Sequence, residues 1–134
     1  MLGAFRLERD QARTGLALLG LIGGTIGVVY LLGTAQVSRV AGLPVDGRSR
    51  WALRMFGVRE LLLGLGLYHA SRRDDPEEAR LFAALTALSQ LGDLAVTTAA
   101  LGSGGSRRLG LAVWLTAPPT IAFAELIRRS YAAS

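Results

Sequence analysis

Residues 14–37 read TGLALLGLIGGTIGVVYLLGTAQV, and this stretch decides the fold class because it contains no charged side chain. A helix of this length crosses a hydrocarbon core of about 30 Å with tilt to spare. A basic start followed by an apolar run is also typical of signal peptides. Here the run is longer than the apolar region of a signal peptide, and Gly33-Thr34-Ala35 makes a poor cleavage site. We therefore expect an uncleaved membrane-spanning helix.

Three further apolar stretches of helical length follow, separated by short polar segments. Asp75 and Pro76 precede the second of them as a helix N-cap and a first helical residue. Pro118-Pro119 should interrupt the last one. The sequence thus predicts an all-α protein, an integral membrane four-helix bundle with a single domain over residues 1–134. Its spans would cover about residues 14–37, 51–69, 81–101 and 109–127.

The composition agrees with a membrane protein and excludes several kinds of site. Hydrophobic residues make up 51% of the 134 residues, cysteine is absent and histidine occurs once. Disulfides and cysteine nucleophiles are thereby excluded, and we expect neither a metal site nor a cofactor. The net charge of +5 comes from arginine alone, and the arginines gather at the ends of the apolar stretches. Because this pattern suits lipid head groups, the expected partner is the lipid bilayer and not nucleic acid.

The arginines also predict an orientation, because positive residues concentrate on the cytoplasmic side of a membrane. Four spans would place both termini on the side that carries more arginine, so the termini are predicted to be cytoplasmic. The use of arginine without lysine, together with much alanine and glycine, is typical of a bacterial protein, and the predicted location is the bacterial inner membrane. The richer side would hold Arg6, Arg9, Arg13, Arg72, Arg73, Arg80, Arg128 and Arg129, and the other Arg39, Arg48, Arg50, Arg107 and Arg108, with Arg54 at its edge.

Glycines at helical spacing indicate how the spans pack. Gly20, Gly24 and Gly27 lie on the first span, and Gly57 and Gly64 lie on the second. Small residues let helix backbones approach closely in lipid, where burial of apolar surface drives no association. The glycines are explained either by tight packing within the chain or by a contact between copies, so a homo-oligomer or another membrane protein is an expected partner.

Three charged residues lie deep inside the predicted spans: Arg59 and Glu60 in the second and Asp93 in the third. A charge in the hydrocarbon costs about 2.5–3.5 kcal/mol, so these side chains should face the interior of the protein. At 1.5 Å per residue, Glu60 lies about 12 Å from the outer end of its span, and Asp93 reaches the same depth on its own span. We therefore expect the three residues to meet at one level.

Uncharged polar residues extend this cluster into a predicted pocket. Thr86, Gln90, Asp93 and Thr97 follow spacings of four, three and four, which place them on one helix face. Thr25 and Thr116 reach a similar depth on the first and last spans. The predicted catalytic residues are Asp93, Glu60 and Arg59, and the predicted substrate-binding residues are Gln90, Thr25, Thr116 and Thr97.

A purely structural role competes with this interpretation, because Arg59 could neutralise the acids and attach the second helix to the third. One arginine cannot neutralise two carboxylates, however, and the remaining acid must be protonated, solvated or paired with Arg54. An unbalanced buried acid is a candidate for proton handling. Both interpretations stay open at this point.

The segment Gly57-Val58-Arg59-Glu60-Leu61, followed by Asp93, resembles a family of small four-helix bacterial membrane proteins known as a domain of unknown function. In that family a Gly-x-Arg-acid-Leu segment opens the second helix and an aspartate follows on the third. The resemblance implies the helical architecture and directs attention to Arg59, Glu60 and Asp93. It implies no activity.

The predicted function is the binding of a small lipophilic molecule in a buried Arg–carboxylate pocket. If the protein is an enzyme, an isomerase, cyclase or epoxide-opening reaction fits best, because such reactions need a carboxyl group and a dry pocket but no cofactor. Asp93 or Glu60 would then be the general acid or base, and Arg59 would orient it. The alternatives are a proton-coupled carrier and a non-catalytic accessory or assembly subunit of a membrane complex.

Overall fold

The computed structural model describes residues 7–44 and 46–132, and this part of the chain is almost entirely helical, with no strand. The all-α prediction is confirmed, but the predicted number of four helices is wrong. Five helices form in these ranges: α1 (Arg9–Leu32), α2 (Thr34–Val40), α3 (Gly47–Arg73), α4 (Pro76–Gly102) and α5 (Arg107–Ala132).

The additional helix arises where the first predicted span breaks at Gly33. The φ and ψ angles of Gly33 are −107° and 33°, outside the helical region, and its N–H donates to the carbonyl of Val29. The hydroxyl of Thr34 then donates to the carbonyl of Tyr30 at 2.7 Å, which satisfies one of the carbonyls left free at the end of α1. The chain therefore changes direction after α1 and forms the short helix α2.

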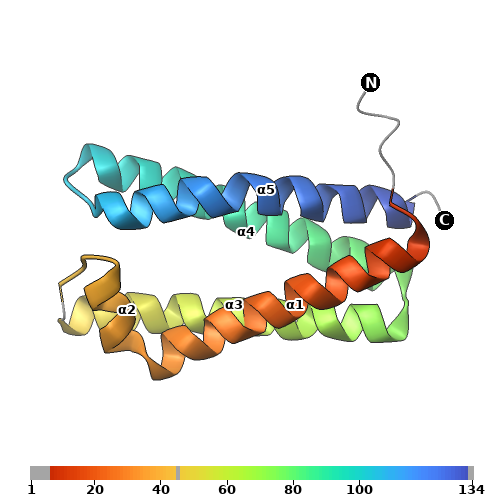
Figure 1. The fold of residues 1–134 in the computed structure, drawn as a ribbon, viewed down its shortest axis with the longest axis horizontal. Coiled ribbons are helices and arrows are strands. Elements are labelled where there is room, and N and C mark those ends of the chain that lie inside the picture. The colour runs from red at the N-terminus through yellow and green to blue at the C-terminus, as the bar shows by residue number, and fades with distance from the viewer. Residues whose placement is uncertain (1–6, 45, 133–134) are drawn as a thin grey trace.

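The long helices form two hairpins that lie side by side (Figure 1). In one hairpin α1 packs along α3, with α2 at the end where α3 begins. In the other α4 packs along α5. Contacts within each hairpin are extensive, and contacts between the hairpins, α3 with α4 and α1 with α5, are much sparser.

Glycine explains the close approach of α1 to α3. A Cβ atom added to Gly20 would lie 2.7 Å from the carbonyl oxygen of Gly64, and one added to Gly27 would lie 2.6 Å from the backbone nitrogen of Leu61. Both distances are shorter than a van der Waals contact, so the two backbones touch where side chains are missing. Gly24 has open space around its own Cβ position, although its backbone closely approaches the Cβ position of Gly64.

The turn between α3 and α4 contains the N-cap that the sequence predicts for α4. The side chain of Asp75 accepts hydrogen bonds from the backbone N–H groups of Glu77 and Glu78, at 2.9 and 3.3 Å, and Pro76 is the first residue of α4. Asp74 ends α3 in the left-handed conformation, with φ of 52°. The prediction of Asp75 as an N-cap is therefore confirmed.

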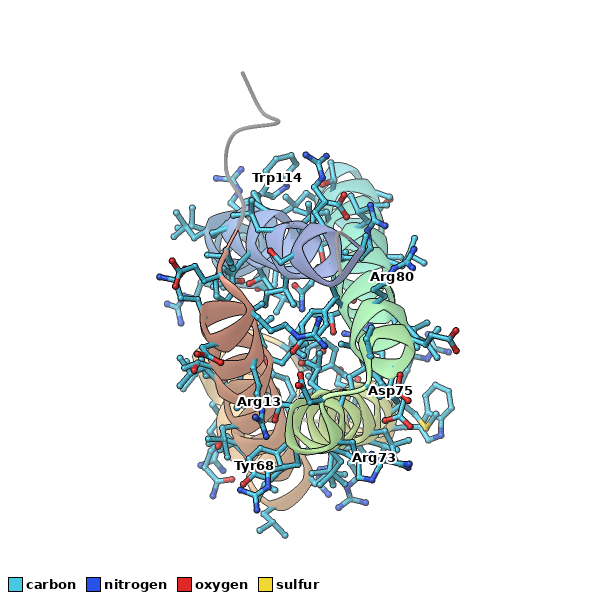
Figure 2. The ribbon with its side chains drawn as sticks, turned by 90° about the vertical axis from the view of Figure 1, so that its right-hand side faces the viewer. Arg13, Tyr68, Arg73, Asp75, Arg80 and Trp114 are labelled. Carbon is cyan, nitrogen blue, oxygen red and sulfur yellow. The ribbon has the colours of Figure 1, made fainter. Side chains whose placement is uncertain are left out.

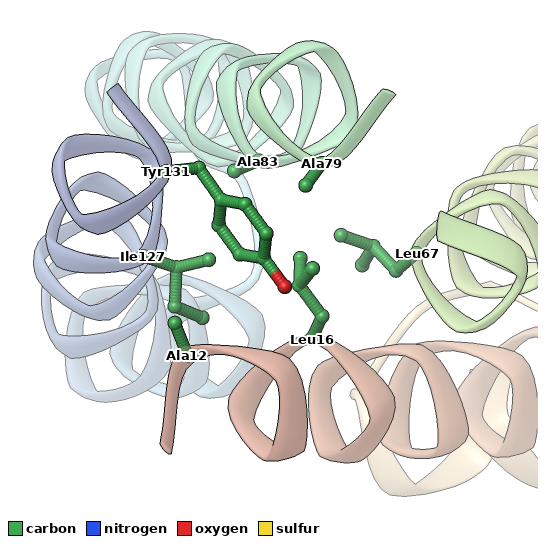
Figure 3. Close-up of a cluster of buried hydrophobic side chains, with 7 residues drawn as sticks. All are labelled: Ala12, Leu16, Leu67, Ala79, Ala83, Ile127 and Tyr131. Atoms are coloured by element: carbon green, nitrogen blue, oxygen red, sulfur yellow. The ribbon is translucent and has the colours of Figure 1, made fainter. Parts of the chain in front are cut away.

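One buried cluster joins the hairpins at the end where α1 begins and α5 ends (Figure 3). Tyr131 and Ile127 of α5 meet Leu16 of α1 and Leu67 of α3 there. Figure 2 views the molecule from this end, with Arg13, Arg73 and Arg80 near its rim. The cluster consists of Ala12, Leu16, Leu67, Ala79, Ala83, Ile127 and Tyr131.

Three of the described helices, α1, α4 and α5, are long and apolar enough to cross a membrane. Their outer surfaces expose large apolar side chains such as Leu32, Val96 and Trp114, which suits contact with lipid. The predicted span over residues 51–69 is corrected here, because α3 is as long as α4 but does not meet the same criterion. Its apolar stretch is interrupted by Arg54, Arg59 and Glu60.

The predicted interruption at Pro118-Pro119 is also corrected, since α5 runs through both prolines without a break. A proline removes one helical hydrogen bond and leaves the carbonyl four residues earlier without its usual partner. The hydroxyls of Thr116 and Thr120 donate to carbonyls one turn earlier, those of Ala112 and Thr116, at 2.7 Å each. These bonds add to the backbone hydrogen bonding on both sides of the prolines.

Candidate functional site

Arg59 and Asp93 form the central contact of the candidate site. The Nη1 atom of Arg59 donates to Oδ1 of Asp93 at 2.8 Å, and Nη2 donates to Oδ2 at 2.7 Å. This two-bond geometry matches the planar guanidinium to the planar carboxylate. Since Arg59 lies on α3 and Asp93 on α4, the pair joins the two hairpins near the middle of their length.

Glu60 adds a second carboxyl group that is more deeply buried. Its side chain is 9% exposed, against 35% for Arg59. The Oε1 atom accepts one hydrogen bond from Nη2 of Arg59 at 3.1 Å. The Oε2 atom points toward α1, where it lies 3.7 Å from the Cβ position of Gly23. Because Gly23 has no side chain, α1 leaves room in front of this oxygen.

The helical repeat explains why Arg59 and Glu60 take different directions. Consecutive residues diverge by about 100° around a helix, so Glu60 points inward and Arg59 points toward α4. The guanidinium of Arg59 also lies over the ring of Phe56, with its Cζ atom 4.5 Å from the ring centre. Its Nε atom is buried without a hydrogen-bond partner among the described residues. Two acids and one aromatic ring thus fix the position of Arg59.

A cavity of about 420 Å³ lies beside this cluster, between the two hairpins. Apolar side chains of α1, α3 and α5 form most of its wall, among them Ile26, Leu63 and Val113. Glu60 and Asp93 are among the residues that line it, whereas Arg59, which binds both of them, is not. The polar lining residues are Tyr30, Glu60, Thr86, Gln90, Asp93, Thr116 and Thr120.

The structure brings together most of the residues that the sequence analysis selected. Arg59, Glu60 and Asp93 meet at one level, as the depth count predicts. Gln90 and Thr116 line the same cavity.

Thr25 and Thr97 do not line the cavity, although the sequence analysis selected both as substrate-binding residues. Thr25 is exposed on α1, and its hydroxyl donates to the carbonyl of Leu21 at 2.7 Å. Thr97 is half-buried one helical turn beyond Asp93. The position of Thr25 along α1 agrees with the predicted depth. Its side chain, however, lies on a different face of α1 from Gly23 and Tyr30.

Three polar lining residues, Tyr30, Thr86 and Thr120, were not predicted as site residues. Tyr30 lies seven residues after Gly23, which is two helical turns, so the spacing would place both on one face of α1. Thr86 belongs to the polar stripe that contains Gln90, and Thr120 lies four residues after Thr116. Helical spacing from a residue already selected could therefore have identified each of them.

The cavity opens sideways, between α1 and α5. At one end these helices are held together by Phe123 and Ile127, which pack against Gly15. At the other end the hydroxyl of Ser106 donates to the carbonyl of Ala41. Between the two ends the lining residues Ile22, Ile26 and Thr116 are exposed, so the opening faces the surroundings of the helices and not the ends of the molecule.

The opposite side, between α3 and α4, is held at several levels, including the contacts of Glu78 on α4 with His69 and Arg73 on α3. The ring of Phe82 on α4 occupies the space above Gly66 on α3, where a Cβ atom would collide with it. The Arg59–Asp93 pair lies farther along the same two helices. Access to the cavity is therefore asymmetric, with one open side and one closed side.

The charged groups of the site give acid–base chemistry a structural basis. Asp93 receives two hydrogen bonds from Arg59, whereas Glu60 receives one and leaves Oε2 facing the cavity. The two carboxyl groups therefore differ in their hydrogen-bond partners and in their exposure. In residues 7–44 and 46–132, histidine, cysteine and acidic side chains form no group of three that could hold a metal ion.

Comparison with known proteins gives no relative: no protein-family model, no curated protein and no solved structure matches the chain. The resemblance of residues 57–61 and Asp93 to a family of small bacterial membrane proteins therefore stays a prediction.

Proposed function

We propose that this chain is a multi-pass membrane protein whose cavity between the two hairpins binds a small lipophilic molecule. The observation that carries this proposal is the burial of the Glu60 and Asp93 carboxyl groups at the wall of a mostly apolar cavity of about 420 Å³. Small-molecule sites combine apolar walls with a few converging polar groups, and this cavity has that composition.

The side opening supports the lipophilic character of the ligand. Ile22 and Ile26 border the opening on α1, and Ala112 and Thr116 border it on α5. Because α1 and α5 are both candidate membrane spans, a molecule dissolved in the bilayer would reach the cavity without crossing water. Gln90 and Thr86 offer hydrogen-bonding groups to orient it.

Acid–base catalysis without a cofactor is a second candidate, favoured by the different surroundings of the two acids. Glu60, with one oxygen facing the cavity, would act as general acid or base. Asp93, held by Arg59, would stabilise positive charge on a reacting molecule. Isomerisation, cyclisation or epoxide opening would suit this arrangement.

For location, we propose the inner membrane of a bacterium, with the end that carries the buried cluster in the cytoplasm. Arginine supports this orientation, since Arg13, Arg72, Arg73 and Arg80 all lie toward that end. A second copy of the chain or another membrane protein is a proposed partner, because Trp114 and many other large apolar side chains face outward.

Labelling with a lipophilic photoreactive probe tests the binding function. The purified protein in lipid nanodiscs is irradiated with an alkyl diazirine, and the labelled residues are identified by mass spectrometry. Saturable labelling of α1 and α5 residues beside the opening, such as Ile26, is the expected result. Thr116→Trp should fill the opening and suppress this labelling, whereas Leu115→Trp, at a neighbouring exposed position outside the cavity, should leave it unchanged. Equal labelling of both variants would contradict the proposal.

A further inference from the structure

We propose that the cavity binds a lipophilic cation in exchange for a proton on Glu60. This inference rests on the proposed binding function and deepens it, because it specifies the charge of the ligand and couples its binding to proton release. The ligand class is an amine or quaternary ammonium compound with apolar substituents.

The charge balance of the site is the first argument. Asp93 and Glu60 are acids, and among the described residues the guanidinium of Arg59 is the cation that pairs with them. Both Nη atoms of Arg59 bind Asp93, and Nη2 is shared with Glu60 at a longer distance. The cluster therefore carries an excess negative charge if Glu60 is ionised. A buried carboxylate that shares one guanidinium with a second acid is incompletely neutralised, so the empty cavity favours a proton on Glu60.

The arrangement of the charges is the second argument. Glu60 and Asp93 are among the residues that line the cavity, whereas Arg59 is not. A ligand in the cavity meets the acids first and the guanidinium behind them. A cation would be attracted by both carboxylates, and an anion would be repelled by the nearest charges.

Aromatic rings in the wall provide the third argument. Tyr30 and Phe56 line the cavity, with ring centres 4.8 Å apart and planes tilted by 48°. The face of an aromatic ring attracts a cation, and the attraction is strongest where water is excluded. Arg59 occupies one face of Phe56, which shows that this ring already accepts a positive group.

The exchange involves a small set of titratable groups. Facing Glu60 are Tyr30 from α1, Arg59 from its own helix α3 and Asp93 from α4, while α5 adds no titratable group to the described lining. When a cation enters, Glu60 loses its proton to the aqueous solution and its carboxylate pairs with the cation. The charge within the cavity stays constant in the exchange, so no unpaired charge is buried in either state.

Two isosteric probes test the charge preference: phenyltrimethylammonium and tert-butylbenzene differ by one nitrogen-centred charge and have nearly the same shape. Their binding to the protein in zwitterionic nanodiscs is measured by calorimetry, with empty nanodiscs subtracted. The cation should bind more tightly than the hydrocarbon. Its Kd should fall about tenfold per pH unit over the range in which Glu60 is protonated in the empty protein. Protons should also be released into a weakly buffered solution as the cation binds.

Variants of Glu60 identify the exchanging group. Glu60→Gln should abolish the proton release and the pH dependence, because glutamine cannot ionise. Glu60→Asp keeps the carboxyl group and should retain the proton release with weaker binding. Glu77→Gln removes an exposed carboxyl group on α4 outside the cavity and should behave as the unmodified protein. Circular dichroism melting curves confirm that each variant is folded.

The outcomes separate this inference from the binding function on which it rests. Saturable binding of both probes with equal affinity would leave the cavity as a binding site and overturn the cation preference. Unchanged proton release in Glu60→Gln would overturn the role of Glu60. If neither probe binds saturably and the photoreactive probe labels no cavity residue, the binding function itself is wrong.

Discussion

Arg59 on α3 and Asp93 on α4 are joined by two parallel hydrogen bonds of 2.8 and 2.7 Å, and this pair is a charged contact between the two hairpins. Other described contacts between α3 and α4 are sparse. The pair therefore links the stability of the fold to the chemistry of the site, since a change that alters one alters the other.

Breaking this pair should destabilise the protein. Asp93→Asn leaves the guanidinium of Arg59 without its main counter-charge, and a coupling free energy of about 1–3 kcal/mol is expected for a pair that is partly exposed. A double-mutant cycle of Arg59→Gln and Asp93→Asn measures it from thermal unfolding in detergent. Strictly additive effects of the two substitutions would show that the pair contributes nothing beyond its separate residues.

The glycine contact between α1 and α3 predicts opposite effects at neighbouring positions. Gly27→Ala places a Cβ atom against the backbone of Leu61 and Gly57 and should lower the free energy of unfolding by about 1–3 kcal/mol. Gly24→Ala meets open space and should be neutral or stabilising by up to about 1 kcal/mol, because alanine favours helix. The melting temperatures of the two variants, measured under the same conditions, test this difference. Equal loss in both variants would mean that the helices do not pack on this face.

The buried cluster that joins the hairpins predicts a large effect of truncation. Ile127 is fully buried among Leu16, Leu67 and Tyr131, so Ile127→Ala should cost about 2–5 kcal/mol. Leu115→Ala lies on the same helix at an exposed position and serves as the control. Unfolding by denaturant in mixed micelles gives both values. A loss at Leu115 as large as that at Ile127 would show that the outer face of α5 is also packed.

The start of α3 predicts a dependence of stability on pH. The side chain of Asp46 accepts the backbone N–H of Ser49 at 2.8 Å, and this bond lowers the pKa of Asp46 below its ordinary value of 3.8. A lowered pKa means that the carboxylate stabilises the helix start above the ordinary pKa and loses this effect as the pH falls through the lowered value. The difference in melting temperature between the protein and Asp46→Ala should therefore be constant near neutral pH and shrink below about pH 3.8. A difference that persists unchanged in acid would contradict the capping role.

The sequence predicted the level of the charged cluster well, because the depth of a residue in a straight helix depends only on its distance along the chain. Arg59, Glu60 and Asp93 met for that reason. The face of the helix on which a side chain lies is a separate quantity. The distance of a residue along the helix gives no information on that face. Thr25 has a suitable depth but the wrong direction, whereas Tyr30 was overlooked although its spacing from Gly23 gives the direction.

Helix boundaries were predicted less well, for two physical reasons. The apolar run continues across Gly33 to Val37, so hydropathy gave no sign of the break that separates α1 from α2. Helices α3 and α5 also extend beyond their apolar stretches, to Arg73 and Ala132. Arginine is a good helix former and continues a helix into the polar region, where an apolar pattern can no longer follow it.

The two hairpins are attached to each other more firmly on one side of the cavity than on the other. The buried cluster, the Phe82–Gly66 contact and the Arg59–Asp93 pair lie at one end or along α3 and α4, whereas the far end of the open side is held by the Ser106–Ala41 hydrogen bond. On the opposite side, Phe123 and Ile127 also hold α5 against α1 at the end that carries the buried cluster. The hairpins are thus attached along α3 and α4 and at both ends of the α1–α5 side, which leaves the middle of that side as the way into the cavity.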